Sequence, residues 1–474
     1  METEFNKLNI SDKDSDKNFN LEDGNCSYCN KPFIEELWCK ECDPFRMIEG
    51  WTSGNNDIDK FIKDTIYEAR YTAKSYDIKF LEWVPFDKFK DIKQIGEGGF
   101  AKVYSATWID GRANYEKQDD GSWKKRESGS HTVALKRLNG SQNMSVEYLN
   151  ELKTHWNYNK SGIGYTLQFY GITKDPETKE FMMILEFANK GNLSSFLLSD
   201  FNKILWKDKI NYLYWISANL NDLHELKYIH KDFHSGNILQ IDDDKSYISD
   251  FGLSGPSNKQ KSDDKVCGVL PYIAPEVLNG EPYTLSSDIY SFGVIMTEFS
   301  SGKPPFYNRK HDVSLALDIC NGLRPEFGKG TPEFYKKLAY KCMNANSSQR
   351  PTVEELHDII SFWDKCLNEE FYQEKEQYGY KGKEVKTAFE EADKEIPNIS
   401  TSYKKNPDAI YTSRLFTFNN LTKPVNSSII TSYLDDDEEN NNKDNQDSQL
   451  VDLEVSSSLL QLKGKDDPRN ESSN

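Results

Sequence analysis

The stretch that decides the fold reads His230-Lys231-Asp232-Phe233-His234-Ser235-Gly236-Asn237. It places one carboxylate, Asp232, five residues before one carboxamide, Asn237, between the largely apolar segments 226–229 and 238–241. Such a loop suits an aspartate that orients a hydroxyl nucleophile and an asparagine that holds a metal ion. Eight residues are weak evidence alone. The interpretation therefore depends on whether the rest of the chain supplies, in order, the other residues that such a catalytic site needs.

The bulk composition excludes several classes of protein. The 474 residues are enough for two or three domains, including one ordinary enzyme core. The net charge of −18 argues against nucleic-acid binding, because polyphosphate would be repelled. No apolar run is long enough to cross a bilayer, and the polar N-terminus lacks the apolar centre of a secretory signal. We therefore expect an intracellular, cytoplasmic protein without membrane insertion.

Two Cys-x-x-Cys pairs lie near the N-terminus. They are Cys26 with Cys29 and Cys39 with Cys42. Thiolates favour Zn²⁺, and four of them complete its tetrahedral shell without an open position for catalysis. We predict a zinc-ribbon-like module with a linker helix over residues 25–88. The alternative is a set of reduced cysteines in a flexible arm.

Composition divides the rest of the chain. Residues 1–24 are polar and predicted to be disordered. Apolar residues at helical spacing predict a helix over residues 56–75. Residues 110–131 are charged and indicate an extended, solvent-exposed connection. Residues 367–474 are polar and acidic and indicate a mostly disordered tail, in which 371–395 is a candidate helix.

A glycine-rich segment lies between two apolar segments with strand character. Its relevant residues are Ile95, Gly96, Glu97, Gly98, Gly99, Phe100, Ala101 and Val103. Glycines let backbone amides approach phosphate oxygens, and Ile95 and Val103 can pack on an adenine base. Alone, such a turn is equally consistent with an ordinary hairpin.

Taken in order, these segments resemble a eukaryotic protein kinase, nearest to the tyrosine-kinase-like group. The opening stretch resembles the catalytic loop H-R-D-x-x-x-x-N, with Lys231 in place of the arginine. Residues 132–136 (Thr-Val-Ala-Leu-Lys) are similar to the V-A-I-K strand, and residues 250–252 (Asp-Phe-Gly) to the D-F-G motif. Residues 268–276 end in Ala-Pro-Glu, like the family's A-P-E segment.

The resemblance implies the fold class. We expect an α+β, bilobal protein-kinase fold over residues 89–366. It would have a small antiparallel β lobe with one helix and a larger, mainly helical lobe.

The resemblance also implies the catalytic residues. Lys136 would hold the α and β phosphates of ATP. Asn237 and Asp250 would hold Mg²⁺, and Asp232 would orient the acceptor hydroxyl. Glycines of the segment around Gly98 would cover the phosphates.

The helix after Lys136 would supply an ion partner for that lysine. Glu151 best resembles the family's helix glutamate, and Glu147, one turn earlier, is the alternative. His155 stands where the family usually places an apolar side chain.

Further residues would surround the adenine. Ala134 belongs to this set, Leu185 would be the gatekeeper, and Leu239 would form the floor of the pocket. The backbone of Glu186 and Ala188 would hydrogen-bond the base.

Two structural contacts are implied as well. Asp288 would anchor the backbone of the catalytic loop. Glu276 of the A-P-E segment would form a buried ion pair with Arg350. Removing either partner of this pair should strongly destabilise the fold.

Two departures from the family pattern bear on activity. Serine/threonine kinases usually carry a lysine where His234 stands and a threonine where Val269 stands. An imidazole supplies less positive charge than lysine to a transferring phosphate, so we predict a slow enzyme. Lys231 keeps a positive charge beside Asp232 that could bind a phosphorylated residue of the loop between Asp250 and Glu276. Activation by phosphorylation of this loop is therefore an alternative that the sequence leaves open. The candidate acceptors are Ser254, Ser257 and Ser262.

The sequence thus predicts an ATP- and Mg²⁺-dependent protein kinase that transfers the γ-phosphate to a protein hydroxyl, serine or threonine before tyrosine. The alternative is a nucleotide-binding pseudokinase or signalling scaffold, suggested by His234, Val269 and His155. Expected partners are protein substrates, together with adaptors or upstream kinases that contact the N-terminal module and the tail.

Overall fold

The structure is a computed structural model. It describes residues 33–35, 38–39, 52–72, 79–98, 101–112, 114–117, 123–126, 129–160, 166–242, 245–257, 266–418 and 421–439. Near the N-terminus, β1 (Phe33–Glu35) pairs antiparallel with β2 (Trp38–Cys39). The predicted zinc ligands Cys26, Cys29 and Cys42 lie outside the described residues, and of Cys39 only the backbone is described.

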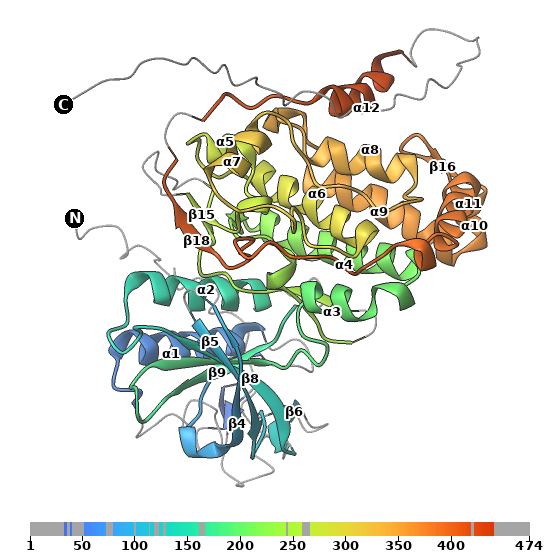
Figure 1. The fold of residues 1–474 in the computed structure, drawn as a ribbon. Helices are drawn as coiled ribbons and strands as arrows, with labels where there is room; N and C mark the ends of the chain where they lie inside the picture. The colour runs from blue at the N-terminus through green and yellow to red at the C-terminus, as the bar shows by residue number, and fades with distance from the viewer. Residues whose placement is uncertain are drawn as a thin grey trace, which may run out of the picture. The chain divides into compact units, whose positions relative to one another are not determined.

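A six-stranded sheet forms the first part of the main domain (Figure 1). In spatial order its strands are β3 (Glu82–Trp83), β9 (Phe169–Lys174), β10 (Phe181–Glu186), β8 (His131–Leu138), β5 (Ala101–Trp108) and β4 (Phe89–Glu97). All neighbours are antiparallel except β3 and β9. The sheet is the expected β lobe, and β4 and β5 form the expected strand-turn-strand around the glycine-rich turn.

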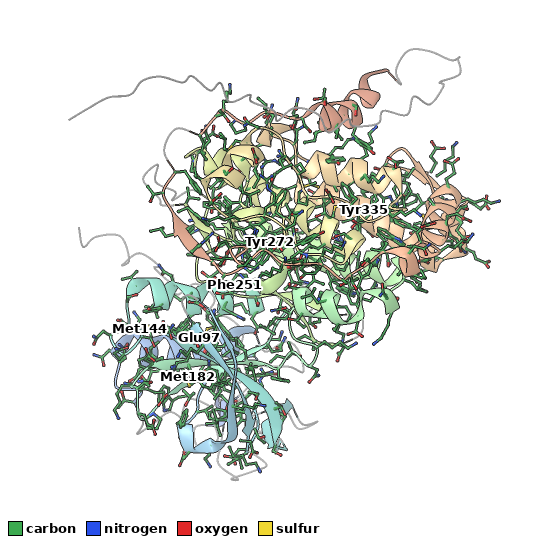
Figure 2. All side chains as sticks on the ribbon, viewed as in Figure 1. Glu97, Met144, Met182, Phe251, Tyr272 and Tyr335 are labelled. Atoms are coloured by element: carbon green, nitrogen blue, oxygen red, sulfur yellow. The ribbon has the colours of Figure 1, made fainter. Side chains whose placement is uncertain are left out.

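Both faces of the sheet are covered, which explains the unbroken apolar run of β10. Met182 and Ile184 belong to one apolar cluster with Val133 of β8, whereas Met183 and Leu185 belong to another. Adjacent residues of a strand point to opposite faces, so a strand buried on both sides is apolar throughout. Figure 2 marks Met182 inside this part of the molecule.

Two helices accompany the sheet. The predicted helix is α1 (Asn56–Thr72), and the side chain of Asn55 caps it by accepting hydrogen bonds from the amides of residues 57 and 58. The other helix is α2 (Val146–Lys160). Apolar residues of α1, including Ile62, share a buried cluster with Leu152 of α2. The helix that leads into the domain is therefore part of its core.

The connection predicted over residues 110–131 is more ordered than expected. Within it, β6 (Asn114–Lys117) and β7 (Trp123–Arg126) pair as an antiparallel ribbon. The sequence between them contains Asp119-Asp120-Gly121, which has turn-forming composition. We predicted an extended connection from the high charge of this segment, and this charge gave no sign of the strand pair.

The second part of the main domain is helical. Its helices are α3 (Leu193–Asp200), α4 (Trp206–Glu225), α5 (Pro275–Leu278), α6 (Leu285–Ser301), α7 (Val313–Cys320), α8 (Glu333–Cys342) and α9 (Val353–Asn368). Every residue of α6 from Ser287 to Ser301 is buried, as expected of a central helix surrounded by others. Tyr335 of α8, marked in Figure 2, is also fully buried and donates a hydrogen bond to the carbonyl of Met296. None of the described helices is both long and apolar enough to span a membrane.

Short antiparallel strand pairs accompany the helices, and two of them frame the catalytic stretch. The antiparallel pairs are β11 (Tyr228–Ile229) with β14 (Gly255–Pro256), β12 (Ile238–Gln240) with β13 (Ser246–Ile248), β15 (Val266–Gly268) with β18 (Arg414–Phe416), and β16 (Glu376–Gln377) with β17 (Tyr380–Lys381). Short 3₁₀ helices are η2 (Phe86–Lys88), η3 (Phe201–Lys203), η4 (Ser235–Asn237), η5 (Leu270–Tyr272), η6 (Ser347–Gln349) and η7 (Ile396–Asn398). β11 precedes the stretch 230–237 and β12 follows it, so two strand pairs hold both of its ends.

The chain beyond residue 367 differs from the disordered tail that we expected. It forms α10 (Glu370–Gln373), α11 (Gly382–Asp393) and α12 (Ser428–Glu439). Phe389 of α11 is fully buried with its ring 5.3 Å from that of Trp206, and Asp393 accepts a hydrogen bond from the Trp206 amide at 2.7 Å. The candidate helix over residues 371–395 is therefore confirmed in part, as α10 and α11, whereas its packing against Trp206 was not expected. Residues 440–474 lie outside the described part.

Candidate functional site

The catalytic stretch is anchored through Asp288, as the resemblance implied. One oxygen of this buried carboxylate accepts from the amide of His230 at 2.8 Å, and the other accepts from the amide of Lys231 at 3.1 Å. Lys231 has a φ of 68°, a left-handed conformation that is unusual for a residue other than glycine. Anchoring by Asp288 holds the backbone in this conformation directly before Asp232.

Asp232 is buried, and its two carboxylate oxygens differ in their hydrogen-bond partners. The Nδ2 of Asn237 donates to the Asp232 carbonyl at 3.0 Å and to Oδ2 at 3.3 Å. Within the described part of the chain no hydrogen-bond donor reaches Oδ1. Burial would raise the pKa of Asp232, but His234 and hydrogen bonds to the carboxylate hold the pKa below its ordinary value. Asp232 is therefore ionised at neutral pH.

Lys136 joins three elements of the fold. Its Nζ lies 2.7 Å from Oε1 of Glu151 in α2 and 2.8 Å from Oδ1 of Asp250, which follows β13. Burial would lower the pKa of Lys136, but the two carboxylates raise it above the ordinary value, so the side chain remains charged. Of the two glutamates considered from the sequence, the structure pairs Glu151 with the lysine.

Asp250 and Asn237 are held near each other by a backbone link. The amide and the hydroxyl of Ser249 donate to the Asn237 carbonyl at 2.8 and 2.9 Å. Asp250 itself has a φ of 64°, which turns the chain at this point. A carboxylate and an amide oxygen are donors that suit Mg²⁺, and the buried Oδ1 of Asp232 without a donor fits a site that receives charged groups. The residues therefore fit the expected metal.

The expected adenine-binding residues also come together. Leu185 is buried in the cluster that covers one face of the sheet, and Ala134, Ala188 and Leu239 pack against that cluster as partly buried side chains. The Glu186 amide donates to the Gln168 carbonyl at 3.0 Å, which fixes the start of the segment after β10.

The glycine-rich turn is described only in part. Gly98 closes it by donating its amide to the Ala101 carbonyl at 2.9 Å, and Gly96 lies opposite Val103 in the sheet. Glu97 forms an ion pair with Lys102 at 3.4 Å. Ile95 is 51% exposed, so in this structure it packs less than we expected. The predicted residues Gly99 and Phe100 lie outside the described part.

His155 acts as a packing residue. Its ring lies 5.2 Å from that of Phe169 and 5.2 Å from that of Phe251, with edge-on geometry in both cases. Phe251, marked in Figure 2, belongs to the Asp-Phe-Gly motif. Burial and the nearby charge of Lys136 lower the pKa of His155 to about 3, which keeps the ring neutral. The histidine takes the place of the expected apolar side chain.

The two departures from the family pattern lie beside Asp232. The Nε2 of His234 is 3.6 Å from Oδ1 of Asp232, and its Nδ1 accepts from the Gly236 amide at 3.1 Å. Val269 is 2% exposed and adds no hydroxyl to this network. The surroundings of Asp232 thus contain an imidazole where lysine is usual.

Glu276 and Arg350 form the implied buried pair. The guanidinium binds both carboxylate oxygens, at 2.7 and 2.6 Å, and also donates to the carbonyls of Ser286 and Asn344. This bidentate contact joins the A-P-E segment to the residues before α9.

Two features were not anticipated from the sequence. The hydroxyl of Ser413 donates a hydrogen bond to Oδ2 of Asp232. Ser413 lies in a polar segment far along the chain, and no local signal distinguishes it from other serines.

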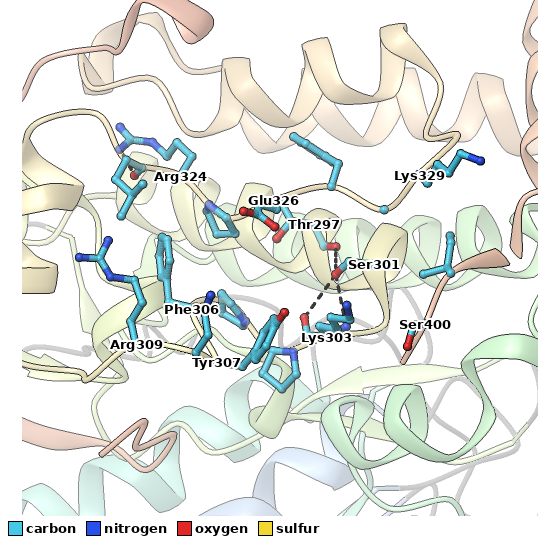
Figure 3. A pocket seen from close by; sticks show the side chains of 18 of the residues that line it. Thr297, Ser301, Lys303, Phe306, Tyr307, Arg309, Arg324, Glu326, Lys329 and Ser400 are labelled. Carbon is cyan, nitrogen blue, oxygen red and sulfur yellow. Dashed lines mark hydrogen bonds between the residues drawn. The ribbon is translucent and has the colours of Figure 1, made fainter. Parts of the chain in front are cut away.

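The second feature is a pocket of about 380 Å³ between the end of α6 and the loops around Tyr307 and Glu326 (Figure 3). Its lining includes Ser400 of the C-terminal segment but none of the residues that surround Asp232.

Comparison with known proteins agrees with this geometry. Residues 89–360, more than half of the chain, match the model of the family described as protein tyrosine and serine/threonine kinase. The chain belongs to this kinase family. Its expected α+β fold, with a β-sheet lobe and a helical lobe, is confirmed at the level of the family and the structure.

Individual relatives are distant and mostly longer. A probable serine/threonine-protein kinase of Dictyostelium discoideum is 29% identical over 264 residues, which cover 55% of this chain and 15% of the relative. The probable serine/threonine-protein kinase drkB of the same organism is 28% identical, with 56% of this chain and 36% of the relative covered. The probable LRR receptor-like serine/threonine-protein kinase RFK1 of Arabidopsis thaliana is 28% identical, with 61% and 28% covered. The similarity thus concerns the kinase domain and less than half of each relative.

No group of three or more histidine, cysteine or acidic side chains in the described part could hold a metal ion. The side chains of the four predicted zinc ligands lie outside the described part, so the zinc site stays a prediction.

Proposed function

We propose that this chain is an ATP- and Mg²⁺-dependent protein kinase that phosphorylates serine or threonine hydroxyls. One observation carries the proposal: Nζ of Lys136 contacts Glu151 at 2.7 Å and Asp250 at 2.8 Å. A lysine fixed between a helix carboxylate and the carboxylate of the Asp-Phe-Gly motif is the arrangement that positions ATP phosphates in protein kinases.

The roles of the other residues follow from their positions. Asp232 would accept a hydrogen bond from the acceptor hydroxyl and orient its oxygen toward the γ-phosphate. Lys136 would neutralise charge on the phosphate oxygens. Asp250 and Asn237 would hold Mg²⁺, which when bound neutralises charge on the transferring phosphoryl group. Catalysis would depend mainly on positioning and charge.

Two observations support serine or threonine as the acceptor. The similar proteins of Dictyostelium discoideum and Arabidopsis thaliana are named serine/threonine-protein kinases. In this structure the short side chain of Ser413 reaches Oδ2 of Asp232. A site in which a serine hydroxyl reaches the carboxylate suits an aliphatic hydroxyl group.

A nucleotide-binding scaffold is the second candidate function. The observation that favours it is His234, whose Nε2 lies 3.6 Å from Asp232 where the family usually places a lysine. Lys136, Asp232 and Asp250 nevertheless supply the groups for transfer, so we prefer the kinase.

Three finer proposals rest on sequence alone. These are membership of the tyrosine-kinase-like group, a cytoplasmic location, and partner contacts through the N-terminal region and the tail. A zinc site formed by Cys26, Cys29, Cys39 and Cys42 also stays a proposal. Metal analysis of the purified chain should give about one zinc per molecule, lost in Cys26→Ser, and a metal-free chain would remove this proposal.

Transfer of labelled γ-phosphate to an added protein such as casein tests the kinase proposal. Lys136→Met should lower the rate by about 10²-fold or more, because a charge that stabilises the transition state is removed. Lys381→Met is the matched control, since Lys381 is 61% exposed in a surface ion pair with Glu384 and should leave the rate unchanged. Equal rates of phosphate transfer by wild type and Lys136→Met would refute the proposed kinase function. Nucleotide binding without any transfer would favour the scaffold.

A further inference from the structure

A segment distant in sequence from the kinase motifs lies along the expected acceptor side of the site. β18 (Arg414–Phe416) pairs antiparallel with β15 (Val266–Gly268), which directly precedes the segment leading to Ala-Pro-Glu. Gly268 lies opposite Arg414, and Val266 lies opposite Phe416. Figure 1 shows the two strands side by side. The C-terminal segment thus adds a strand to this part of the domain, which is a common way of binding an extended peptide.

The register of this strand pair places Ser413 at Asp232. Ser413 precedes β18 and donates its hydroxyl to Oδ2, the oxygen that also accepts from Nδ2 of Asn237 at 3.3 Å. Gly268 lies close to the other oxygen, since a Cβ at this position would be 3.4 Å from Oδ1. The hydroxyl therefore makes the contact that the proposed mechanism requires of an acceptor.

The residues before Ser413 are held on the helical part of the domain. The His311 amide donates to the Asp408 carbonyl at 3.1 Å, and the His311 ring contacts the Ile410 carbonyl at 2.9 Å. The hydroxyl of Tyr411 donates to the Pro305 carbonyl at 2.8 Å. These contacts fix the segment on one side of the serine.

The residues after Ser413 are held as well. The guanidinium of Arg414 donates to the His311 carbonyl. The rings of Phe416 and Phe418 stack at 5.2 Å and pack against the large apolar cluster of the helical part. Further along, the Val425 amide donates to the Cys320 carbonyl at 2.9 Å. With anchors on both sides, the position of Ser413 is determined by many contacts and not by its own hydrogen bond.

We propose that residues 408–418 are a substrate built into the chain, and that the kinase phosphorylates its own Ser413 in cis. This inference rests on the proposed kinase function. Oγ of Ser413 would attack the γ-phosphorus of ATP, forming a new O–P bond. The bond from that phosphorus to the bridging oxygen breaks, and its electron pair leaves with ADP. The hydroxyl proton passes to the Asp232 carboxylate and then to solvent.

Tethering makes the reaction in cis faster than any encounter between molecules. A segment linked to its site has an effective concentration of about millimolar, far above a micromolar concentration of protein in an assay. The rate of Ser413 phosphorylation per molecule should therefore not depend on dilution.

The test uses the full chain with labelled ATP, Mg²⁺ and casein, with the modified residues identified by mass spectrometry. Wild type should carry phosphate on Ser413, with a rate per molecule unchanged on about tenfold dilution. Ser413→Ala should lose this phosphopeptide. Thr412→Ala, which removes the exposed hydroxyl of the neighbouring residue, should keep phosphate on Ser413. A Lys136→Met chain mixed with wild type should stay unmodified at Ser413.

Three results would overturn the inference. If casein is phosphorylated but Ser413 of wild type is not, the segment is no substrate while the kinase proposal stands. If the Lys136→Met chain is modified at Ser413 as fast as wild type, the reaction occurs between molecules. If neither casein nor Ser413 is phosphorylated, this inference and the proposed function both fail.

Discussion

Nζ of Lys136 lies 2.7 Å from Oε1 of Glu151, and both side chains are buried. This pair couples β8 to α2. Charges taken out of water in this way depend on each other, because removal of one leaves the other without compensation.

Glu151→Gln should therefore impair phosphate transfer. The amide keeps the shape of the side chain but loses the charge that orients Lys136, so we expect kcat/KM to fall by about tenfold or more. Glu147→Gln, one helical turn earlier, is the matched control and should retain wild-type kcat/KM. Equal losses in the two variants would contradict the assignment.

Arg350→Met should lower stability more than a surface charge deletion. The variant leaves Glu276 buried without its bidentate partner, at a cost of about 3–5 kcal/mol in the free energy of unfolding. Urea denaturation measures this change, with Lys381→Met as the control expected to stay within about 0.5 kcal/mol. A loss below about 1 kcal/mol for Arg350→Met would show that the pair contributes little.

The sequence was informative wherever function depends on short spacings. The interval from Asp232 to Asn237 and the Asp-Phe-Gly motif at Asp250 are local patterns, and the structure places these residues together. The choice between Glu151 and Glu147 required the structure, because the two glutamates are four residues apart in the sequence and no local pattern separates them.

Contacts made by the C-terminal segment could not be predicted in the same way. The pairing of β18 with β15 depends on the docking of segments about 150 residues apart, and register between such segments has no local signature. The helix that contains Phe389 was a candidate from the sequence, but its packing against Trp206, about 180 residues earlier, has no local signature.

His155→Leu should stabilise the protein, most strongly under acid conditions. The ring nitrogens have no hydrogen-bond partner in the described part, so leucine should raise the free energy of unfolding at pH 7 by about 1 kcal/mol. The pKa of His155 is lowered from 6.5 to about 3 by burial, followed by the charge of Lys136. Below pH 6.5 the unfolded chain therefore binds a proton that the folded chain excludes, and wild type loses stability as pH falls toward 3. The advantage of the variant should grow by about 2 kcal/mol between pH 7 and pH 5. Parallel pH profiles for variant and wild type in urea denaturation would contradict this account.

His234→Lys should increase turnover. Lysine would bring a positive charge near the phosphoryl group beside Asp232, and we expect kcat to rise by about tenfold. The lost hydrogen bond from the Gly236 amide has a small cost, which thermal unfolding can monitor. Unchanged or lower kcat in a folded variant would show that the imidazole does not limit the rate.

The central claim is that phosphoryl transfer takes place at Asp232. The most direct measurement compares wild type with Asp232→Asn for transfer of labelled γ-phosphate to casein, with binding of Mg²⁺–ATP measured in parallel. Asparagine cannot accept the hydroxyl proton, so we predict that transfer falls by about 10²-fold or more while nucleotide binding is retained. Equal transfer by the two proteins would contradict the claim.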